Sequence, residues 1–145
     1  MKRAAALISL SHDHQHALAV ALQLRRADDP GAARRAFLDF VTSEGEEHFR
    51  IEEEVLLPFV AGEVPADDPD VARVLREHAQ LREHARRLSA EPEPDVAELQ
   101  ATGDLLTGHV RFEERVLFPR IEALLDDARL TELGILLRRA EPASS

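Results

Sequence analysis

An eleven-residue motif occurs twice in this chain, and each copy places a His four residues before a Glu. The first copy, His48 to Pro58, reads HFRIEEEVLLP, and the second, His109 to Pro119, reads HVRFEERVLFP. On an α-helix, residues four apart lie on the same face at a distance of about 6 Å. A His and a carboxylate held in this way bind one metal ion, or two neighbouring ions if the carboxylate bridges them. The repeated motif therefore predicts two halves of one two-metal site.

Apolar residues recur every three or four positions along most of the chain, which is the period of an α-helix. Stretches with Pro and Gly interrupt the pattern at residues 28–31, 62–70 and 89–95. The pattern predicts helices over about 9–27, 32–60, 70–88 and 95–125, and a short one over 130–139. Four long helices joined by short loops predict an all-α, up-down-up-down four-helix bundle with a short extra C-terminal helix.

The two helix pairs correspond to each other along the sequence. The interval from His48 to His109 is 61 residues, and the interval from His14 to His78 is 64 residues. The first two helices therefore look like a repeat of the next two, related by a pseudo-twofold axis. Such a repeat brings both motifs to the same part of the core, within a single domain over residues 1–145.

Composition and charge exclude several classes of function. The net charge of −10 argues against binding to nucleic acid or to an anionic membrane. The absence of cysteine excludes Fe–S clusters, disulfides and thiol nucleophiles. No apolar run approaches the roughly 20 residues that span a membrane, and the apolar run after Arg3 is short for a signal peptide. We expect a cytoplasmic protein.

Two further histidines lie on apolar helix faces. His78 has Val74 and Leu75 one turn before it and Leu81 after it. In the first helix, His14 shares its face with Leu10, Ala17, Leu18 and Ala21, whereas the face of His16 is more polar. We select His14 as the inward residue and keep His16 as the second choice. His84 lies between Gln80 and Arg87 on its own face and is expected in solvent.

The candidate metal ligands are therefore four His and two Glu, contributed by all four long helices. They are His14, His48, Glu52, His78, His109 and Glu113. Burying so many polar groups without a metal would cost several kcal/mol. Imidazole and carboxylate ligands suit iron, manganese or zinc. Two bridging carboxylates suit a redox pair of irons that binds a small molecule better than a closed structural zinc site.

With these residues the chain resembles the hemerythrin family, in particular its bacterial HHE-type members. The resemblance extends from Leu10 to about Arg139 and is carried by the two HxxxEExxLxP motifs and the dipeptides Asp13-His14 and Glu77-His78. It implies a non-haem centre of two iron ions in the bundle core, bridged by both Glu residues and an oxo or hydroxo group (Fe–O–Fe or its hydroxo form). In this family such a centre binds O2 or nitric oxide.

The chain differs from the oxygen-carrying hemerythrins at two positions. Those proteins have a His-x-x-x-His pair on the third helix, where this chain has Arg82 four residues after His78. Their fourth helix has an Asp five residues after a His, where this chain has Glu113 four residues after His109. One fewer His leaves a more open or differently ligated iron, which argues against reversible O2 storage.

Two further carboxylates are of interest because of the same resemblance. Glu44 lies one turn before His48, where the repeat has Leu105, and Glu77 immediately precedes His78. The resemblance to the di-iron repair proteins of the family implies that both line a polar path to the metals. We expect Glu44 to act as an outer carboxylate or a proton relay.

The sequence thus favours a di-iron protein that binds or senses O2, or that reacts with NO or peroxide. We expect its pocket to be lined by Ile51, Leu81, Phe112 and Ala17, which would admit small neutral gases. The alternative is an iron or metal store or donor without redox turnover, which the acidic surface would suit equally well. No residue pattern indicates a particular protein redox partner.

Overall fold

The computed structural model of the protein describes residues 2–142, and this part of the chain is all helical, as expected. α1 (Ile8–Arg26) follows a 3-10 turn at Ala5–Leu7. The second helical run contains α2 (Pro30–Phe40), η2 (Val41–Gly45), α3 (Glu46–Ile51), η3 (Glu52–Leu56), α4 (Leu57–Val60) and η4 (Ala61–Glu63). The remaining elements are α5 (Pro69–Ala90), α6 (Val96–Phe112), η5 (Glu113–Leu117), α7 (Phe118–Leu124) and α8 (Asp127–Ala140).

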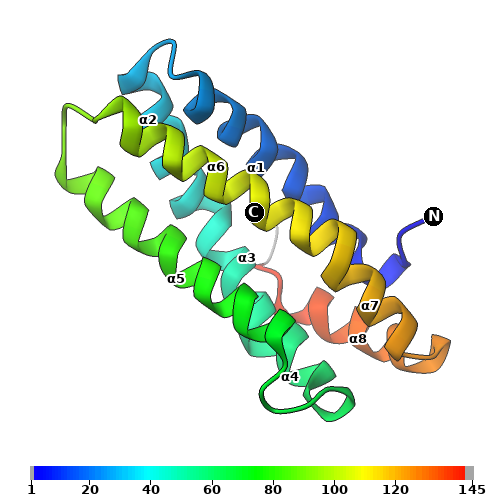
Figure 1. Ribbon diagram of the computed structural model, residues 1–145. Coiled ribbons are helices and arrows are strands. Elements are labelled where there is room, and N and C mark those ends of the chain that lie inside the picture. The colour runs from blue at the N-terminus through cyan, green and yellow to red at the C-terminus, as the bar shows by residue number, and fades with distance from the viewer. Residues whose placement is uncertain (1, 143–145) are drawn as a thin grey trace.

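The helical runs lie side by side around a shared interior (Figure 1). α1 contacts α6 and α2, and α5 contacts the same two helices from the other side. α8 lies at the end of the molecule near the N-terminus, where it contacts η1 (Ala5–Leu7) and η3. It covers that end of the core with Leu133 and Leu137, both buried. None of the described helices is both long and apolar enough to cross a membrane.

Four aspartates begin the main helices by accepting hydrogen bonds from free backbone N–H groups of the first turn. They are Asp29 before α2, Asp68 before α5, Asp95 before α6 and Asp126 before α8. The second run begins at Pro30, two residues earlier than expected. Proline is tolerated there because the first turn of a helix does not use its backbone N–H groups.

The second and fourth runs are not the regular α-helices that the sequence predicted. Each contains a π-helical turn that begins at the motif glutamate. In the second run the N–H of Leu57 donates to the carbonyl of Glu52, and in the fourth run the N–H of Phe118 donates to the carbonyl of Glu113. Pro58 or Pro119 follows directly. Proline has no N–H, and its ring collides with the carbonyl four residues earlier, so a wider turn relieves a clash that a regular helix would contain.

The apolar core is divided into two clusters by a layer of polar side chains. One cluster, at the α8 end, contains Leu10 and Val74, and the other contains Ala17 and Leu81. Along α1, His14 lies between Leu10 and Ala17, and along α5 His78 lies between Val74 and Leu81. The polar layer therefore crosses the interior, about one helical turn from apolar packing on either side.

α1 and α6 lie in close contact at Gly103. A Cβ atom at this position would lie 2.8 Å from the backbone oxygen of Ala21 and 2.7 Å from Cγ of Arg25. The backbone of α1 cannot give way without moving the helix. Gly108, five residues later on α6, would place its Cβ in open space.

We expect Gly103→Ala to lower the free energy of unfolding by about 1–3 kcal/mol, because it forces α1 and α6 apart. Gly108→Ala is the matched control and should be neutral or stabilising by up to about 1 kcal/mol, since Ala favours the helix. Urea unfolding of both variants, in the same metal state, measures the difference. Equal effects at the two positions would contradict the close approach of the helices.

Candidate metal centre

Six buried side chains from all four helical runs converge between the two apolar clusters. We call them the six-residue cluster, and none is more than 6% exposed. They form two groups of four whose potential ligand atoms lie within 4.8 Å of one another. One group is His14, His48, Glu52 and Glu113, and the other is Glu52, His78, His109 and Glu113. These are the six residues that the sequence singled out, and His14 rather than His16 is among them.

Each of the two glutamates directs one oxygen to each half of the cluster. Glu52 places Oε2 3.4 Å from Nε2 of His48 and Oε1 3.0 Å from Nε2 of His78. Glu113 places Oε1 2.8 Å from Nε2 of His14 and Oε2 3.4 Å from Nε2 of His109. Carboxylates in this position can bridge two cations, each of which would also have two imidazole ligands.

Several atoms of the cluster are buried and have no hydrogen-bond partner. They include Nε2 of His48 and of His109, and Oε2 of Glu52 and of Glu113. A buried polar atom without a partner costs free energy, and it is a rare feature that calls for an explanation. Nitrogen and carboxylate oxygen atoms are the donors that iron, manganese and zinc accept. The unpaired atoms of the cluster therefore fit a pair of such ions.

Carboxylates from neighbouring helical runs hydrogen-bond with Nδ1 of three of the histidines. Nδ1 of His48 lies 3.0 Å from Asp13, Nδ1 of His78 lies 2.7 Å from Glu53, and Nδ1 of His109 lies 2.9 Å from Glu77. An Nδ1–H that donates to a carboxylate leaves the lone pair of Nε2 free to bind a metal and fixes the orientation of the ring. Sequence reasoning proposed Glu77 but assigned no role to Asp13 or Glu53.

The fourth carboxylate completes a pseudo-symmetric pattern. Glu114 follows Glu113 as Glu53 follows Glu52, and its Oε1 lies 3.5 Å from Nδ1 of His14, too far for a good hydrogen bond. We call Asp13, Glu53, Glu77 and Glu114 the outer carboxylates. The repeated dipeptides Glu-Glu and acidic-His were the sequence signal for them, but the pairing across helices was not visible.

Glu44 and two of the remaining histidines lie outside the cluster. Glu44 hydrogen-bonds with Nδ1 of His16 at 2.9 Å, and both side chains are at least 40% exposed. The proton-relay role expected of Glu44 stays a prediction. His84 is not in solvent as expected, because it hydrogen-bonds with Glu98 and Thr102 and its side chain is only 15% exposed.

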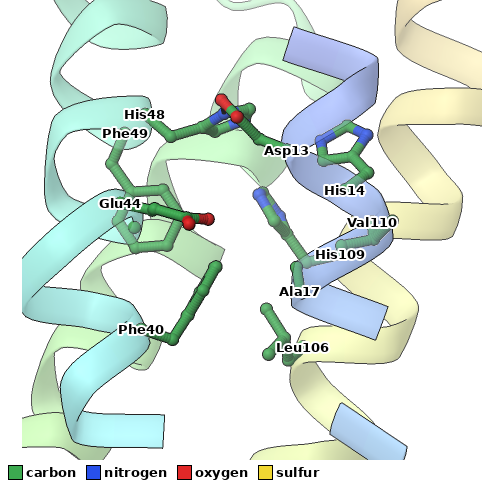
Figure 2. A pocket seen from close by; sticks show the side chains of 11 residues that line it. Asp13, His14, Ala17, Phe40, Glu44, His48, Phe49, Leu106, His109 and Val110 are labelled. Atoms are coloured by element: carbon green, nitrogen blue, oxygen red, sulfur yellow. Dashed lines mark hydrogen bonds and ion pairs between the residues drawn. The ribbon is translucent and has the colours of Figure 1, made fainter. Parts of the chain in front are cut away.

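A small cavity lies beside the His14 and His48 half of the cluster (Figure 2). We call it the inner cavity, and its volume of about 10 Å³ holds roughly one water-sized molecule. Its apolar walls are Ala17, Phe40, Gly45, Phe49, Leu106 and Val110.

Of the four expected lining residues, Ala17 borders this cavity. Ile51 and Phe112 pack in the apolar cluster at the α8 end, and Leu81 packs in the other apolar cluster. The expectation failed because the pattern of the sequence did not show the rotation of each helix about its own axis.

Comparison with known proteins agrees with this geometry. The hemerythrin HHE cation-binding domain matches residues 7–121, which include the whole six-residue cluster. The chain belongs to the hemerythrin HHE cation-binding family. No curated protein and no solved structure matches it.

The buried histidines and glutamates of this hemerythrin domain shift one another's pKa values. Burial alone would lower the pKa of His48, but the charge of Glu52 and the hydrogen bond with Asp13 raise it well above 6.5. The pKa of His109 is also raised, because Glu113 and Glu77 outweigh burial. Burial would raise the pKa of Glu113, but the neighbouring histidines lower it well below 4.5. Protonated imidazole and ionised carboxylate therefore stabilise each other in the metal-free protein.

We expect the metal-free protein to lose stability as the pH rises above about 6.5, whereas the stability of the metal-loaded protein stays nearly constant. His48 and His109 have raised pKa values in the folded state. Their contribution to stability is complete below the unfolded pKa and is lost as the pH rises through the folded pKa, by up to about 1.4 kcal/mol per pH unit for each proton. Metal binding displaces these protons, so metal affinity rises over the same range.

Urea unfolding of chelator-treated and metal-loaded protein between pH 6.5 and 8.5 measures this effect. The stabilisation by metal, which is the difference between the two free energies of unfolding, should grow with pH. A constant difference across the range would show that the cluster exchanges no protons when it binds metal.

The outer carboxylate Glu77 provides a test of ligand orientation. We expect Glu77→Gln to weaken metal binding by about 10- to 100-fold, because the carboxylate that orients His109 is lost. Glu83→Gln on the exposed surface of α5 is the control and should leave affinity unchanged. Competition titrations with a chelator give both affinities, and equal affinities would contradict the orienting role.

Proposed function

We propose that this hemerythrin domain is a non-haem di-iron protein that binds O2 or NO, or reacts with them or with peroxide. The observation that carries the proposal is the position of Glu52 and Glu113, fully buried and each directed to both halves of the cluster. Two shared carboxylates reduce the repulsion between two neighbouring divalent ions and offset part of their charge, whereas a single ion would leave half of the donors unused.

The number of ligand atoms favours a metal centre with open coordination positions over a fully coordinated one. Each half offers two imidazole nitrogens and two carboxylate oxygens. A structural zinc site is complete with four ligands, whereas iron accepts more and keeps positions open for a small molecule. A bound iron pair would supply these open positions and one-electron redox chemistry at each ion. Manganese or zinc would also suit the donor atoms.

The protein contributes orientation and exclusion of water. Asp13, Glu53 and Glu77 hold three imidazole rings at Nδ1, so the opposite nitrogen stays aimed at the centre. The inner cavity is walled by side chains such as Phe40 and Leu106, which favour a small neutral molecule over an ion. In an up-down-up-down bundle with pseudo-twofold symmetry, the equivalent ligands of the two helix pairs meet from opposite sides of the interior.

The first experiment is the metal content of the purified protein after expression with iron available. We expect two irons per chain in the wild type. His109→Ala should retain about one ion, because it belongs to one half, whereas Glu113→Ala should retain close to none, because both halves share it. Plasma mass spectrometry gives the ratios. One ion per chain in the wild type, or equal losses in the two variants, would contradict a shared centre.

Reactivity is tested separately on the iron-loaded protein. We expect the reduced protein to change its visible absorption when it is mixed with O2 or NO in a stopped-flow instrument. Unchanged spectra on every timescale, with two irons present, would exclude the proposed ligands and favour metal storage or donation. Rapid loss of iron to a modest chelator would then support that alternative. The cytoplasmic location stays a prediction.

A further inference from the structure

His14 differs from the other three histidines of the six-residue cluster, because no carboxylate orients its ring at Nδ1. This nitrogen is buried and has no hydrogen-bond partner, and Oε1 of Glu114 lies 3.5 Å from it. In the other three rings Nδ1 lies 3.0, 2.7 and 2.9 Å from a carboxylate, in the order His48, His78 and His109. The hydrogen bond of His14 is at Nε2, 2.8 Å from Oε1 of Glu113. The ring is thus held at the nitrogen that a metal ion would need.

A metal ion at Nε2 of His14 would leave the ring proton on Nδ1. With the side chains where they stand, this N–H would have no acceptor, and solvent offers little replacement because His14 is buried. A buried donor without an acceptor costs free energy. We therefore expect His14 to be the weakest of the four imidazole ligands. A shift of Glu114 toward Nδ1 would strengthen it.

Arg3 and Ser11 bind the other oxygen of the Glu114 carboxylate. Oε2 of Glu114 accepts hydrogen bonds from Arg3 at 3.2 Å and from the hydroxyl of Ser11 at 2.9 Å. Arg3 is itself fixed in place, because it donates to the backbone carbonyl of Glu114 at 2.8 Å and to Oε1 of Glu122 at 2.6 Å. Glu122 belongs to α7, beside which the N-terminal segment lies in Figure 1. Arg3 thus anchors the Glu114 carboxylate to the N-terminal segment.

The equivalent glutamate of the first motif shows that the position of the arginine decides the outcome. Arg82 donates to both oxygens of Glu53, at 2.8 and 3.0 Å, and Glu53 still lies 2.7 Å from Nδ1 of His78. Arg82 follows His78 by four residues on α5, so both side chains approach Glu53 from the same face of one helix. Arg3 comes instead from the segment before α1 and has its own anchor on α7.

We propose that Arg3 is a positioning residue of the metal centre, which holds Glu114 away from His14 and thereby weakens metal binding at the half formed by His14 and His48. The proposal rests on the proposed function, because it requires the six-residue cluster to bind metal. Arg3 and Glu114 are 23% and 29% exposed, and an ion pair near the surface contributes little to stability. A carboxylate that orients a ligand imidazole changes metal affinity by about 10- to 100-fold. Releasing Glu114 therefore gains more affinity than the lost ion pair costs.

Competition titrations of Co²⁺ between a chelator and the metal-free protein test the role of Arg3. We expect Arg3→Gln to bind the Co²⁺ beside His14 about tenfold more tightly than the wild type, because Glu114 becomes free to accept the hydrogen bond of Nδ1. Arg111→Gln is the matched control. It removes the same charge two residues after His109, on the exposed face of α6, and should leave the affinity unchanged.

Double variants show whether the gain passes through Glu114 and His14. In a Glu114→Ala background, Arg3→Gln should give no gain, because no carboxylate remains beside Nδ1 of His14. A His14→Ala background should abolish the gain in the same way. A His109→Ala background keeps His14 and should retain the gain.

NMR of the Zn²⁺-loaded protein gives a measurement on the wild type, which does not depend on the folding of a variant. A buried N–H in a hydrogen bond exchanges slowly with water and gives a sharp proton resonance. We expect the wild type to show such Nδ1–H resonances from three rings, those of His48, His78 and His109. A fourth, from His14, should appear in Arg3→Gln.

Any of four results would overturn the proposal. They are an affinity of Arg3→Gln no higher than that of the wild type, an equal gain in Arg111→Gln, a gain that persists in the Glu114→Ala background, and a His14 Nδ1–H resonance in the wild type. Circular dichroism confirms that each variant is folded. If the wild type itself binds fewer than two Co²⁺ ions, the proposed two-metal site fails, and this outcome is separate from any difference in affinity between variants.

Discussion

The structure depends on two carboxylates, Glu52 and Glu113, buried side by side between four imidazole rings. Two negative charges in a protein interior cost several kcal/mol each unless positive charge lies beside them. In the metal-free protein the carboxylates raise the pKa values of His48 and His109, so that a proton on either imidazole is stabilised beside them. In the metal-loaded protein two cations would provide the positive charge. The outer carboxylates Asp13, Glu53 and Glu77 fix three of the imidazole rings in this arrangement.

The two halves of the centre are equivalent in ligands but not in surroundings. Arg82 and Arg73 neutralise the carboxylates behind His78 and His109, and the ring of Phe49 stacks on His78 at 4.2 Å. The inner cavity is bordered by His14 and His48 of one half and by His109 of the other. Both outer carboxylates behind His78 and His109 pair with an arginine, whereas behind the other half Glu114 pairs with Arg3 and, within residues 2–142, Asp13 pairs with His48 and not with an arginine.

Much of this could be predicted from the sequence, because the relevant signals are local and repeated. Helical periodicity identified the runs, and the apolar neighbours of His14 and His78 showed that both point inward. Other features depend on how one helix meets another. The pairing of Asp13 with His48, and of Glu53 with His78, follows from the rotation of neighbouring helices. The ring of Phe40 in the cavity wall would lie 3.1 Å from a Cβ atom at position 45, so Gly45 leaves room for the ring. Pro58 and Pro119 were a local signal for the π-helical turns, but the helical spacing of the apolar residues predicts a regular α-helix there.

The central claim is that Glu52 and Glu113 each bridge two ions. A crystal structure of iron-loaded protein, with anomalous diffraction measured at the iron absorption edge, tests it most directly. We predict two anomalous peaks about 3.5 Å apart, one beside His14 and His48 and the other beside His78 and His109, with both glutamates between them. A single peak, or a second ion that contacts neither glutamate, would contradict the account.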